Sequence, residues 1–572
     1  MMTDFQKAHI KGVERVAAWA DVLDVINVFP VADGDTGRNL LISLTPLRFL
    51  KNNREETVNK LLLSARGNSG NIAARFFSEF LGADSYAGLA QAAKSGRDQA
   101  WRAVSKPIPG TMLTVLDALV DFLGKSNFEN KTEYVDTIID LLEKSVKSTP
   151  ELLPKLKSAG VVDSGALGIY IFLEGFFKSL IGQHDEFRPI STIFDGLLEI
   201  SPSYQLEIKE GYCVDTVIHL DEYAEDKVTR LRRYSESAVV IPHKDYLKIH
   251  LHTKNSREAR AQIESLGDVI HWTDDNLGSQ IRDFTRLSRQ GAIHIMTDAA
   301  GSVSRQDSRE LGLTLLDSYI VAGEKSLPET HFSPAELYRI MRRGDRVSTS
   351  QASVFERHQY YQRVLSQYPR VLYLCVGSVF TGNYDVAVEW KARNDPDDRL
   401  TVVDTGAASG RLGTIVIASA RYAAQTNDPE AVINFAQRAV EQCEEYVFLD
   451  KLKYLAAGGR LAKSSAFFGD MLHVKPVISP TNEGARKVGA VKNRIGQLKF
   501  ALDKLERAFD KKSTPFIMLE YSDNRDWVNE TVKKEIRARY PSAEIILQPL
   551  SLTSGVHMGP GTWAVAYLPP AV

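Results

Sequence analysis

The sequence predicts a multidomain protein with an N-terminal all-α domain, a small α/β module in the middle and a two-lobed C-terminal α/β domain. Three observations predict this order. A chain of 572 residues is too long to fold around one hydrophobic core. Apolar residues recur at helical spacing to about residue 195, and short strands begin in the stretch between about residues 200 and 285. From Gly291 onward, apolar strands alternate with amphipathic helices to the end of the chain.

We therefore predict three domains, over residues 1–195, 200–285 and 291–572. In the middle module, strands are expected at YCVDTVIHL and YLKIHLHT, and a helix is expected at SREARAQIESL. The C-terminal strands are expected to form parallel sheets of βα units, because a helical segment follows most of them. These strands are AIHIMTD, RVLYLCVGS, RLTVVDTG, TPFIMLEYS and SAEIILQPL.

Composition excludes several classes of protein. The chain is 44% hydrophobic and 25% charged with a net charge of -2, which is typical of a soluble globular protein and does not favour nucleic acid as a partner. The three cysteines are widely spaced and odd in number, which favours a reducing compartment, and we expect the cytoplasm. No apolar run reaches the roughly 18 residues of a transmembrane segment, and the N-terminus carries acids where a signal peptide would be apolar.

The string NVFPVADGDTG follows the first predicted helix and places Asp33 and Asp35 on either side of a glycine. Two carboxylates in such a loop can converge on one hard cation, and Mg²⁺ bound to ATP phosphates needs oxygen ligands of this kind. Taken alone, such a loop is more often a tight turn or a calcium-type loop than a kinase site.

Three further segments place glycine or small polar residues at the start of a predicted helix, as phosphate-binding helices do. LLLSARGNSGNI places Gly67, Asn68, Ser69 and Gly70 before a helix, KPIPGTMLTVL places Gly110 and Thr111, and AGVVDSGALG places Asp163. A helix N-terminus offers free amides and a positive dipole end to phosphate. The alternative for each segment is an ordinary N-cap.

These four elements, in this order, resemble the ATP-binding helical domain shared by dihydroxyacetone kinases and the kinase subunit of bacterial fatty acid kinases. The resemblance covers about 190 residues and implies ATP and Mg²⁺ as cofactors. It implies that Asp33 and Asp35 ligate Mg²⁺ with Asn27 as a third ligand, and that Thr36 and Asn39 belong to the same site. The usual motif has proline and threonine where this chain has Ala32 and Arg38, which leaves the nucleotide preference open.

In YLKIHLHT, strand alternation places His250 and His252 on one face together with Tyr246 and Lys248. Cys213 from the neighbouring strand would complete a three-ligand Zn²⁺ site, while the alternative is a solvated strand face that carries histidines by chance. GYC and KIHLHT also resemble the middle domain of the fatty acid kinase subunit, in which the corresponding cysteine and histidines are implicated in metal binding and activity. Simple dihydroxyacetone kinases lack this module.

The C-terminal half carries the motifs IMTDAAG, VSTSQAS, VGSVFTGNYDVA, VVDTGAASGRLG, KLKYLAAGGRLAKSS, HVKPVIS and GVHMGPG. Their order over about 280 residues resembles the DegV family of fatty-acid-binding proteins. The resemblance implies an apolar slot for an alkyl chain and a set of side chains for its carboxylate. These side chains are Thr349, Ser350, Ser378, Thr381, Arg460 and His557.

Without the family, the hydroxyl residues of this set would be interpreted as a turn or an N-cap and Arg460 as a surface cation. The chain also departs from the family where Asn383 ends the second hydroxyl motif and where Ala299 and Ala300 follow Asp298. Hydrogen bonding after Asp298 must therefore differ from the family pattern.

Together the two resemblances imply a fatty acid kinase with both modules in one chain, in which Asp33, Asp35, Arg460 and His557 act in phosphoryl transfer to a long-chain fatty acid. They also imply a downstream acyltransferase of phospholipid synthesis as a partner, and we expect a homodimer. One alternative is a lipid-binding sensor whose nucleotide domain is regulatory. The other is a kinase of small ketones or polyols of the dihydroxyacetone kinase type.

Overall fold

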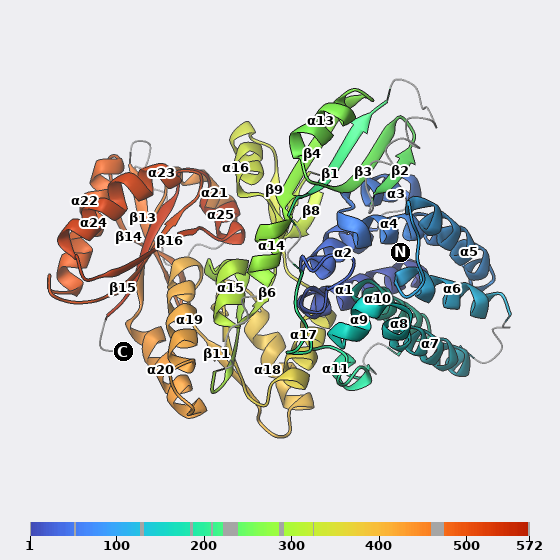
Figure 1. The fold of residues 1–572 in the computed structure, drawn as a ribbon. Helices are drawn as coiled ribbons and strands as arrows, with labels where there is room; N and C mark the ends of the chain where they lie inside the picture. Colours follow the sequence, from blue (N-terminus) through green and yellow to red (C-terminus); the bar gives the residue numbers. More distant parts are fainter. Residues whose placement is uncertain are drawn as a thin grey trace. The chain divides into compact units, whose positions relative to one another are not determined.

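A computed structural model describes residues 2–50, 53–125, 131–183, 187–207, 210–220, 238–284, 291–323, 325–458 and 474–569 of the chain. It separates into two compact units, Met1–Arg286 and Leu287–Val572 (Figure 1). The first unit contains a helical part and a small sheet, and the second contains two lobes of mixed α and β structure. The predicted fold class is confirmed. None of the helices in these ranges combines the length and apolar character that a membrane span requires.

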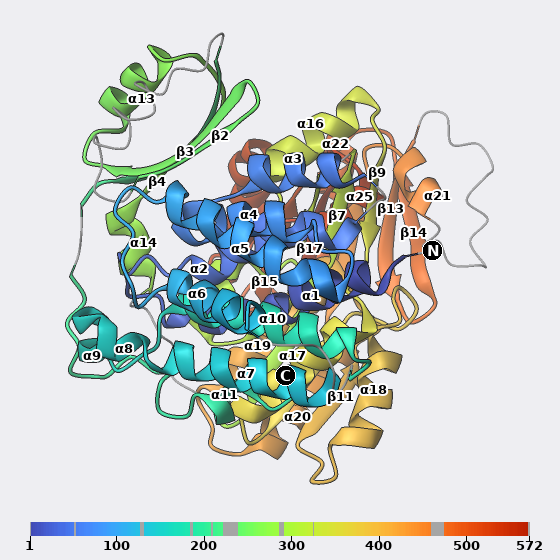
Figure 2. The same ribbon diagram turned by 90° about the vertical axis from the view of Figure 1, so that its right-hand side faces the viewer.

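The helical part of the first unit is built around α1 (Asp4–Val25) and α10 (Ser164–Leu180), which pack along one another (Figure 2). Thr3 begins α1 with a capping box that also uses Gln6. Nearly every residue of α10 is buried, which follows from its apolar sequence. The other helices are α2 (Thr36–Leu44), η1 (Thr45–Phe49), α3 (Arg54–Ser64), α4 (Gly67–Phe80), α5 (Tyr86–Ala103), α6 (Met112–Leu123), α7 (Lys131–Lys147), α8 (Thr149–Leu152), α9 (Pro154–Ala159) and α11 (Ile190–Ile193).

The small sheet of the first unit has the strand order β2-β3-β1-β4 and is antiparallel throughout. Leu247, Ile249 and Leu251 point to one face, where they form a core with α13. The opposite face contacts α4, so Lys248 and His250 on that face are only 3% and 1% exposed. The alternative of a solvated strand face is therefore wrong for these two residues. The elements are β1 (Tyr212–His219), β2 (Val239–His243), β3 (Tyr246–Thr253), α13 (Ser256–Glu264), β4 (Asp268–Asn276) and α14 (Leu277–Phe284).

The first lobe of the second unit contains the parallel sheet β11-β10-β5-β6, as the alternation of strands and helices predicted. A three-stranded antiparallel sheet, β8-β7-β9, adjoins it. The elements are β5 (His294–Asp298), η2 (Ala299–Gly301), α15 (Arg305–Leu311), β6 (Thr314–Leu316), β7 (Tyr319–Ala322), β8 (Lys325–Pro328), η3 (Glu329–His331), α16 (Pro334–Arg343), β9 (Val347–Ser350), α17 (Val354–Gln367), β10 (Val371–Cys375), α18 (Asn383–Asn394) and β11 (Leu400–Asp404).

The second lobe corrects the prediction of parallel sheets. Its six strands have the order β14-β13-β12-β17-β15-β16, and only β15 and β16 pair in parallel. β13 and β14 are joined by Asn482 and Glu483 alone, and a two-residue connection allows only an antiparallel hairpin. The elements are α19 (Ser409–Ala423), α20 (Pro429–Gln442), β12 (Glu444–Phe448), α21 (Lys453–Gly458), β13 (Lys475–Thr481), β14 (Gly484–Val491), α22 (Arg494–Ala508), β15 (Phe516–Tyr521), α23 (Arg525–Trp527), the π-helical η4 (Val528–Lys533), α24 (Lys534–Arg539), β16 (Glu544–Pro549), α25 (Leu552–Met558) and β17 (Trp563–Leu568).

Helix α19 holds the two lobes of the second unit together. It contacts β5 and β10 of the first lobe and β12, β15 and β17 of the second. Ile415, Val416 and Ala420 of α19 are buried in a core that includes residues of both sheets. Because α19 shares one core with both sheets, it fixes the position of the two lobes relative to each other within this unit.

Candidate functional site

The loop between α1 and α2 brings Asn27, Asp33 and Asp35 together. Asn27 is buried and donates a hydrogen bond from Nδ2 to Asp33 Oδ1 at 2.6 Å, and the Ser164 hydroxyl at the start of α10 lies 3.4 Å from Asn27 Oδ1. Burial and the neighbouring Asp35 carboxylate raise the pKa of Asp33 well above its usual range. Asp35 is buried and Asp33 is half-buried, and two carboxyl groups this close favour a shared proton or a cation. Oxygen ligands of this kind fit Mg²⁺.

Arg38, which departs from the family motif, contacts the carboxylate pair. Its Nη2 lies 3.4 Å from Asp35 Oδ2, and its backbone amide donates to Asp24 Oδ1 at 3.1 Å. Burial alone would lower the pKa of Arg38, but Asp35, Asp24 and other nearby carboxylates outweigh it and raise the pKa. Arg38 therefore balances part of the negative charge of the loop.

The starts of α2 and α4 lie side by side at this loop. The Thr36 and Ser69 hydroxyl oxygens are 3.3 Å apart. Gly67 has a φ of +61°, and a Cβ atom there would lie 2.1 Å from Asn39 Nδ2, so the turn before α4 requires glycine. Arg66, the N-cap residue of α4, makes no side-chain cap, which leaves the amides of Asn68 and Ser69 without that partner.

The starts of α6 and α10 meet α4 but are capped by their own side chains. A Cβ atom on Gly165 would lie 2.8 Å from Met112 Cε and 3.7 Å from Ser69 Oγ. The Thr111 hydroxyl accepts a hydrogen bond from the Leu113 amide at 3.4 Å, and the Gly110 amide donates to the Thr114 hydroxyl at 2.7 Å. Asp163 accepts from the Ala166 amide at 2.7 Å, and burial raises its pKa to about 7.

The small sheet brings Cys213, His250 and His252 together. Cys213 on β1 pairs with His252 on β3, and one ligand atom from each of the three residues lies within 4.8 Å of the others. Burial and the nearby Asp215 raise the pKa of the Cys213 thiol. His250 Nε2 is buried and has no hydrogen-bond partner in the part of the chain that the structure describes. One sulfur and two imidazoles with an orphaned nitrogen fit Zn²⁺.

Two residues that we did not predict, Asp215 and Lys248, connect this cluster with α4. Asp215 Oδ2 lies 3.2 Å from His250 Nδ1 and accepts a hydrogen bond from the Gly67 amide at 3.1 Å. Lys248 Nζ lies 3.6 Å from Asp215 Oδ1. Burial opposes ionisation of Asp215, but His250 and Lys248 outweigh it and hold its pKa well below the usual range. Strand alternation could have found Asp215, because it lies two residues from Cys213 on the same face.

The aspartate loop and the cysteine–histidine cluster belong to one site of the first unit. Val31 of the loop packs with Cys213, Leu277 and Ile281 in a buried cluster. Asp275, which pairs with Cys213 across β1 and β4, interacts with the charges of Arg38 and Asp35. The middle module therefore contributes side chains beside the predicted Mg²⁺ ligands.

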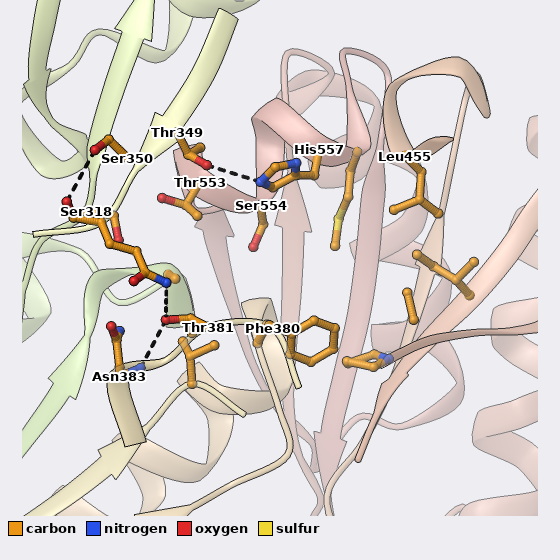
Figure 3. A pocket seen from close by; sticks show the side chains of 18 residues that line it. Ser318, Thr349, Ser350, Phe380, Thr381, Asn383, Leu455, Thr553, Ser554 and His557 are labelled. Atoms are coloured by element: carbon orange, nitrogen blue, oxygen red, sulfur yellow. Dashed lines mark hydrogen bonds between the residues drawn. The ribbon is translucent and has the colours of Figure 1, made fainter. Parts of the chain in front are cut away.

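The second unit contains a cavity of about 220 Å³ between its lobes. Figure 3 shows polar side chains, among them Ser318, Ser350 and Thr349, on one side and Leu455 on the other. Thr349 Oγ1 lies 3.3 Å from His557 Nε2. The polar lining residues are Ser318, Thr349, Ser350, Gln351, Thr381, Asn383, Thr553, Ser554 and His557, and the apolar ones are Ala300, Val376, Phe380, Ala408, Leu455, Ile478, Pro480, Ala485 and Met558.

Four of the six predicted acyl-contacting residues, Thr349, Ser350, Thr381 and His557, line this cavity. Ser378 does not line it, because its hydroxyl donates a hydrogen bond to Asp404 Oδ2 at 2.5 Å. Arg460 lies outside the described residues. We did not predict that Gln351, Asn383, Thr553 and Ser554 contribute to the lining, because single polar residues in loops carry no distinctive pattern.

Asp298 does not line the cavity but accepts hydrogen bonds from residues that do. It accepts hydrogen bonds from Arg357 Nη1 at 2.9 Å, from Asn383 Nδ2 at 2.8 Å and from the Val376 amide at 2.9 Å. Asn383 and Val376 both line the cavity. Asn383, the residue that departs from the family motif, is therefore fixed by a buried carboxylate.

Three protein-family models match the chain. The DAK2 domain matches residues 30–178, the FakA-like middle domain of fatty acid kinase matches residues 209–284, and the model described as uncharacterised protein, DegV family, matches residues 292–570. The chain therefore carries a DAK2 domain, a FakA-like middle domain and a DegV domain.

Relatives of similar sequence include an uncharacterized protein of Staphylococcus haemolyticus, which is 32% identical over 310 residues, 49% of this chain and 56% of the relative. One of Staphylococcus saprophyticus is 30% identical over 335 residues, 52% of this chain and 59% of the relative. The matches thus span little more than half the length of these curated relatives.

Solved structures similar to this chain include a fatty-acid-binding DegV family protein from Thermus thermophilus, with a TM-score of 0.45 and 23% identity over 48% of this chain and 99% of that chain. DegV, a fatty acid binding protein from Bacillus subtilis, has a TM-score of 0.45 and 18% identity over 49% of this chain and 100% of that chain.

Proposed function

We propose that this chain is a fatty acid kinase that transfers the γ-phosphoryl group of ATP to the carboxylate of a bound long-chain fatty acid. The observation that carries the proposal is the presence, in one chain, of an aspartate pair held by Asn27 beside the start of α4 and of a cavity with a polar and an apolar side. The three domain matches support the same combination.

In the first unit, Asp33 and Asp35 with Asn27 are the residues that would hold Mg²⁺, which supplies charge neutralisation to the phosphates. The amides of Asn68 to Gly70 at the start of α4 would receive phosphate oxygens, since a helix N-terminus favours negative charge. Arg38 balances the excess of carboxylates that remains.

In the second unit, the alkyl chain would occupy the apolar side of the cavity and the carboxylate would lie at Thr349, Ser350, Thr381 and His557. A fatty acid carboxyl group with a pKa of about 4 to 5 is ionised at neutral pH, so it needs no general base. One carboxylate oxygen forms a bond to the γ-phosphorus while the bond from that phosphorus to the bridging oxygen breaks. ADP leaves with the electron pair, and the other product is acyl phosphate.

We further propose that the acyl phosphate passes to an acyltransferase of phospholipid synthesis and that the enzyme is a cytoplasmic homodimer. The resemblance to fatty acid kinases supports the first point. The three cysteines, all free and buried in the structure, are compatible with a reducing compartment.

The test is an assay of the purified chain with Mg²⁺, ATP and oleate but no second protein. Because one polypeptide carries both domains, their effective concentration is roughly millimolar when linker geometry permits. ADP release should depend on oleate, and hydroxylamine should trap an acyl hydroxamate. If fatty acids of short and long chain change neither ADP release nor hydroxamate yield, the lipid-sensor alternative replaces the kinase. Turnover of dihydroxyacetone would instead favour the small-ketone kinase.

A further inference from the structure

The strongest unassigned feature of the first unit is the set of contacts around Asp215. This carboxylate is 7% exposed and lies between the cysteine–histidine cluster and the first turn of α4. We propose that Asp215 is a positioning residue that couples metal binding at Cys213, His250 and His252 to nucleotide binding at the start of α4. The inference rests on the proposed nucleotide site and deepens it.

One oxygen of Asp215 contacts both sites, and the other contacts Lys248 and Asn71. Oδ2 lies 3.2 Å from His250 Nδ1 and 3.1 Å from the Gly67 amide nitrogen. Oδ1 lies 3.6 Å from Lys248 Nζ and 3.4 Å from Asn71 Nδ2, whose amide also donates to the Gly67 carbonyl at 2.7 Å. One carboxylate therefore fixes both an imidazole of the cluster and the glycine turn that begins α4.

A carboxylate that holds a metal-ligating imidazole sets the tautomer and orientation of that ring. His250 Nδ1 lies 3.2 Å from Asp215 Oδ2 and 3.9 Å from Cys213 Sγ. In the tautomer in which Nδ1 donates to Asp215, the lone pair of Nε2 is free, and Nε2 is the buried atom that has no partner in the described ranges. A cation bound by the cluster would immobilise His250 and, through it, Asp215.

The effect on the nucleotide follows from Gly67. Its amide is bound by Asp215, so the amides of Asn68 and Ser69 that follow it are held in a fixed direction. The charge of Asp215 is balanced by Lys248, which is itself buried. Metal binding should therefore make nucleotide binding tighter by ordering this turn in advance, and by linkage the nucleotide should tighten the metal by the same factor.

The test measures binding rather than catalysis. The affinity of the full chain for Mg·ADP is measured by calorimetry after loading with Zn²⁺ and after chelation, with the metal content determined by elemental analysis. Hydrogen exchange of peptides that cover the start of α4 is followed in the same two states. We expect Zn²⁺ to tighten Mg·ADP and to slow exchange near Gly67, because the Asp215 contact is then held in place.

In Asp215→Asn, Zn²⁺ affinity should fall by about tenfold or more, as is typical for loss of a carboxylate behind a ligating histidine. The Zn²⁺ dependence of Mg·ADP affinity should also disappear. Asp268→Asn is the matched control, since Asp268 is an exposed carboxylate on β4 of the same sheet, and it should behave as wild type.

The measurements on wild-type protein are enough to refute the proposal, so the test does not depend on whether the variants fold. If Zn²⁺ binds but leaves both Mg·ADP affinity and exchange near Gly67 unchanged, or if Zn²⁺ does not bind, Asp215 couples nothing. Neither readout requires a fatty acid, so a chain that passes this test and yields no acyl hydroxamate would refute the proposed kinase activity separately.

Discussion

Glu329 is a buried carboxyl group beside the acyl cavity, and its protonation links stability to pH. Its Oε2 accepts a hydrogen bond from the amide of Thr553, a lining residue, at 2.9 Å. Burial raises the pKa of Glu329 from an ordinary 4.5 to about 8. The folded protein therefore holds a proton that the unfolded chain releases, between about pH 4.5 and pH 8. The contribution of Glu329 to stability is greatest below pH 4.5 and is lost as the pH rises through 8.

We predict that Glu329→Gln gains stability relative to wild type as the pH rises across this window. Gln has the same size and can still accept from the Thr553 amide, but it does not ionise in the core. The gain at pH 8.5 should be on the order of a few kcal/mol. Denaturant midpoints at pH 5, 6.5 and 8.5 would measure it, with exposed Glu441→Gln as the control. A difference between Glu329→Gln and wild type that is the same at all three values would refute the assignment.

Single side chains differ in how far the sequence could predict their surroundings. Asp33 and Asp35 were predictable because both lie in one short loop, where local spacing sets their distance. The contact of Asp215 with Gly67 was not, because the two residues are 148 positions apart and meet only when the sheet packs on α4. Ser378 was expected at the acyl head but bonds Asp404, a partner on the next parallel strand that no local pattern indicates.

At the scale of elements, the first turn of α4 depends on glycine for two independent reasons. Gly67 has a φ of +61°, and a Cβ atom there would lie 2.1 Å from Asn39 Nδ2. Residues other than glycine rarely adopt this backbone conformation. Asn39 is itself buried at the start of α2, so it has little room to move away. The junction of α2 and α4 therefore cannot accept even one added methyl group without a shift.

We predict that Gly67→Ala weakens Mg·ADP binding by at least tenfold and destabilises the first unit, because the turn must move away from α2. Gly88→Ala on α5 is the matched control. The nearest atom to a Cβ at Gly88 is 3.5 Å away, so this change should be neutral or stabilise by about 0.4 to 1 kcal/mol through the unfolded state. Calorimetry and thermal unfolding would compare the two variants. Equal effects of both would show that the turn is not specifically glycine-dependent.

The sequence predicted strands best where their apolar pattern was strong. YLKIHLHT became β3 with the expected alternation, and the strands of the first DegV lobe pair in parallel. β4 was missed because most of its residues are exposed and polar, which removes the alternation. The antiparallel order of the second lobe was mispredicted because pairing direction is set by connections such as the β13–β14 hairpin, which apolar runs do not reveal.

At the scale of the whole molecule, the two proposed binding sites lie in two separately compact units. The aspartate pair and the metal cluster belong to Met1–Arg286, and the acyl cavity belongs to Leu287–Val572. Each unit has its own buried core. A change confined to one core should therefore leave the binding function of the other unit intact.

We predict a double dissociation between Asp33→Asn and His557→Ala. Asp33→Asn should reduce ATP turnover by at least a hundredfold, because it removes a proposed Mg²⁺ ligand, and should leave the affinity for oleate unchanged. His557→Ala removes the contact with Thr349 at the polar side of the cavity, so it should depress acyl hydroxamate formation while Mg·ADP affinity stays at the wild-type value. Ser378→Ala is a control for the second unit, since its hydroxyl is bonded to Asp404 outside the cavity lining. Calorimetry with oleate and with Mg·ADP, together with a coupled ADP assay, gives all the values on the same preparations. Loss of oleate binding in folded Asp33→Asn would contradict the modular arrangement, because in that arrangement no residue of the first unit acts on the cavity.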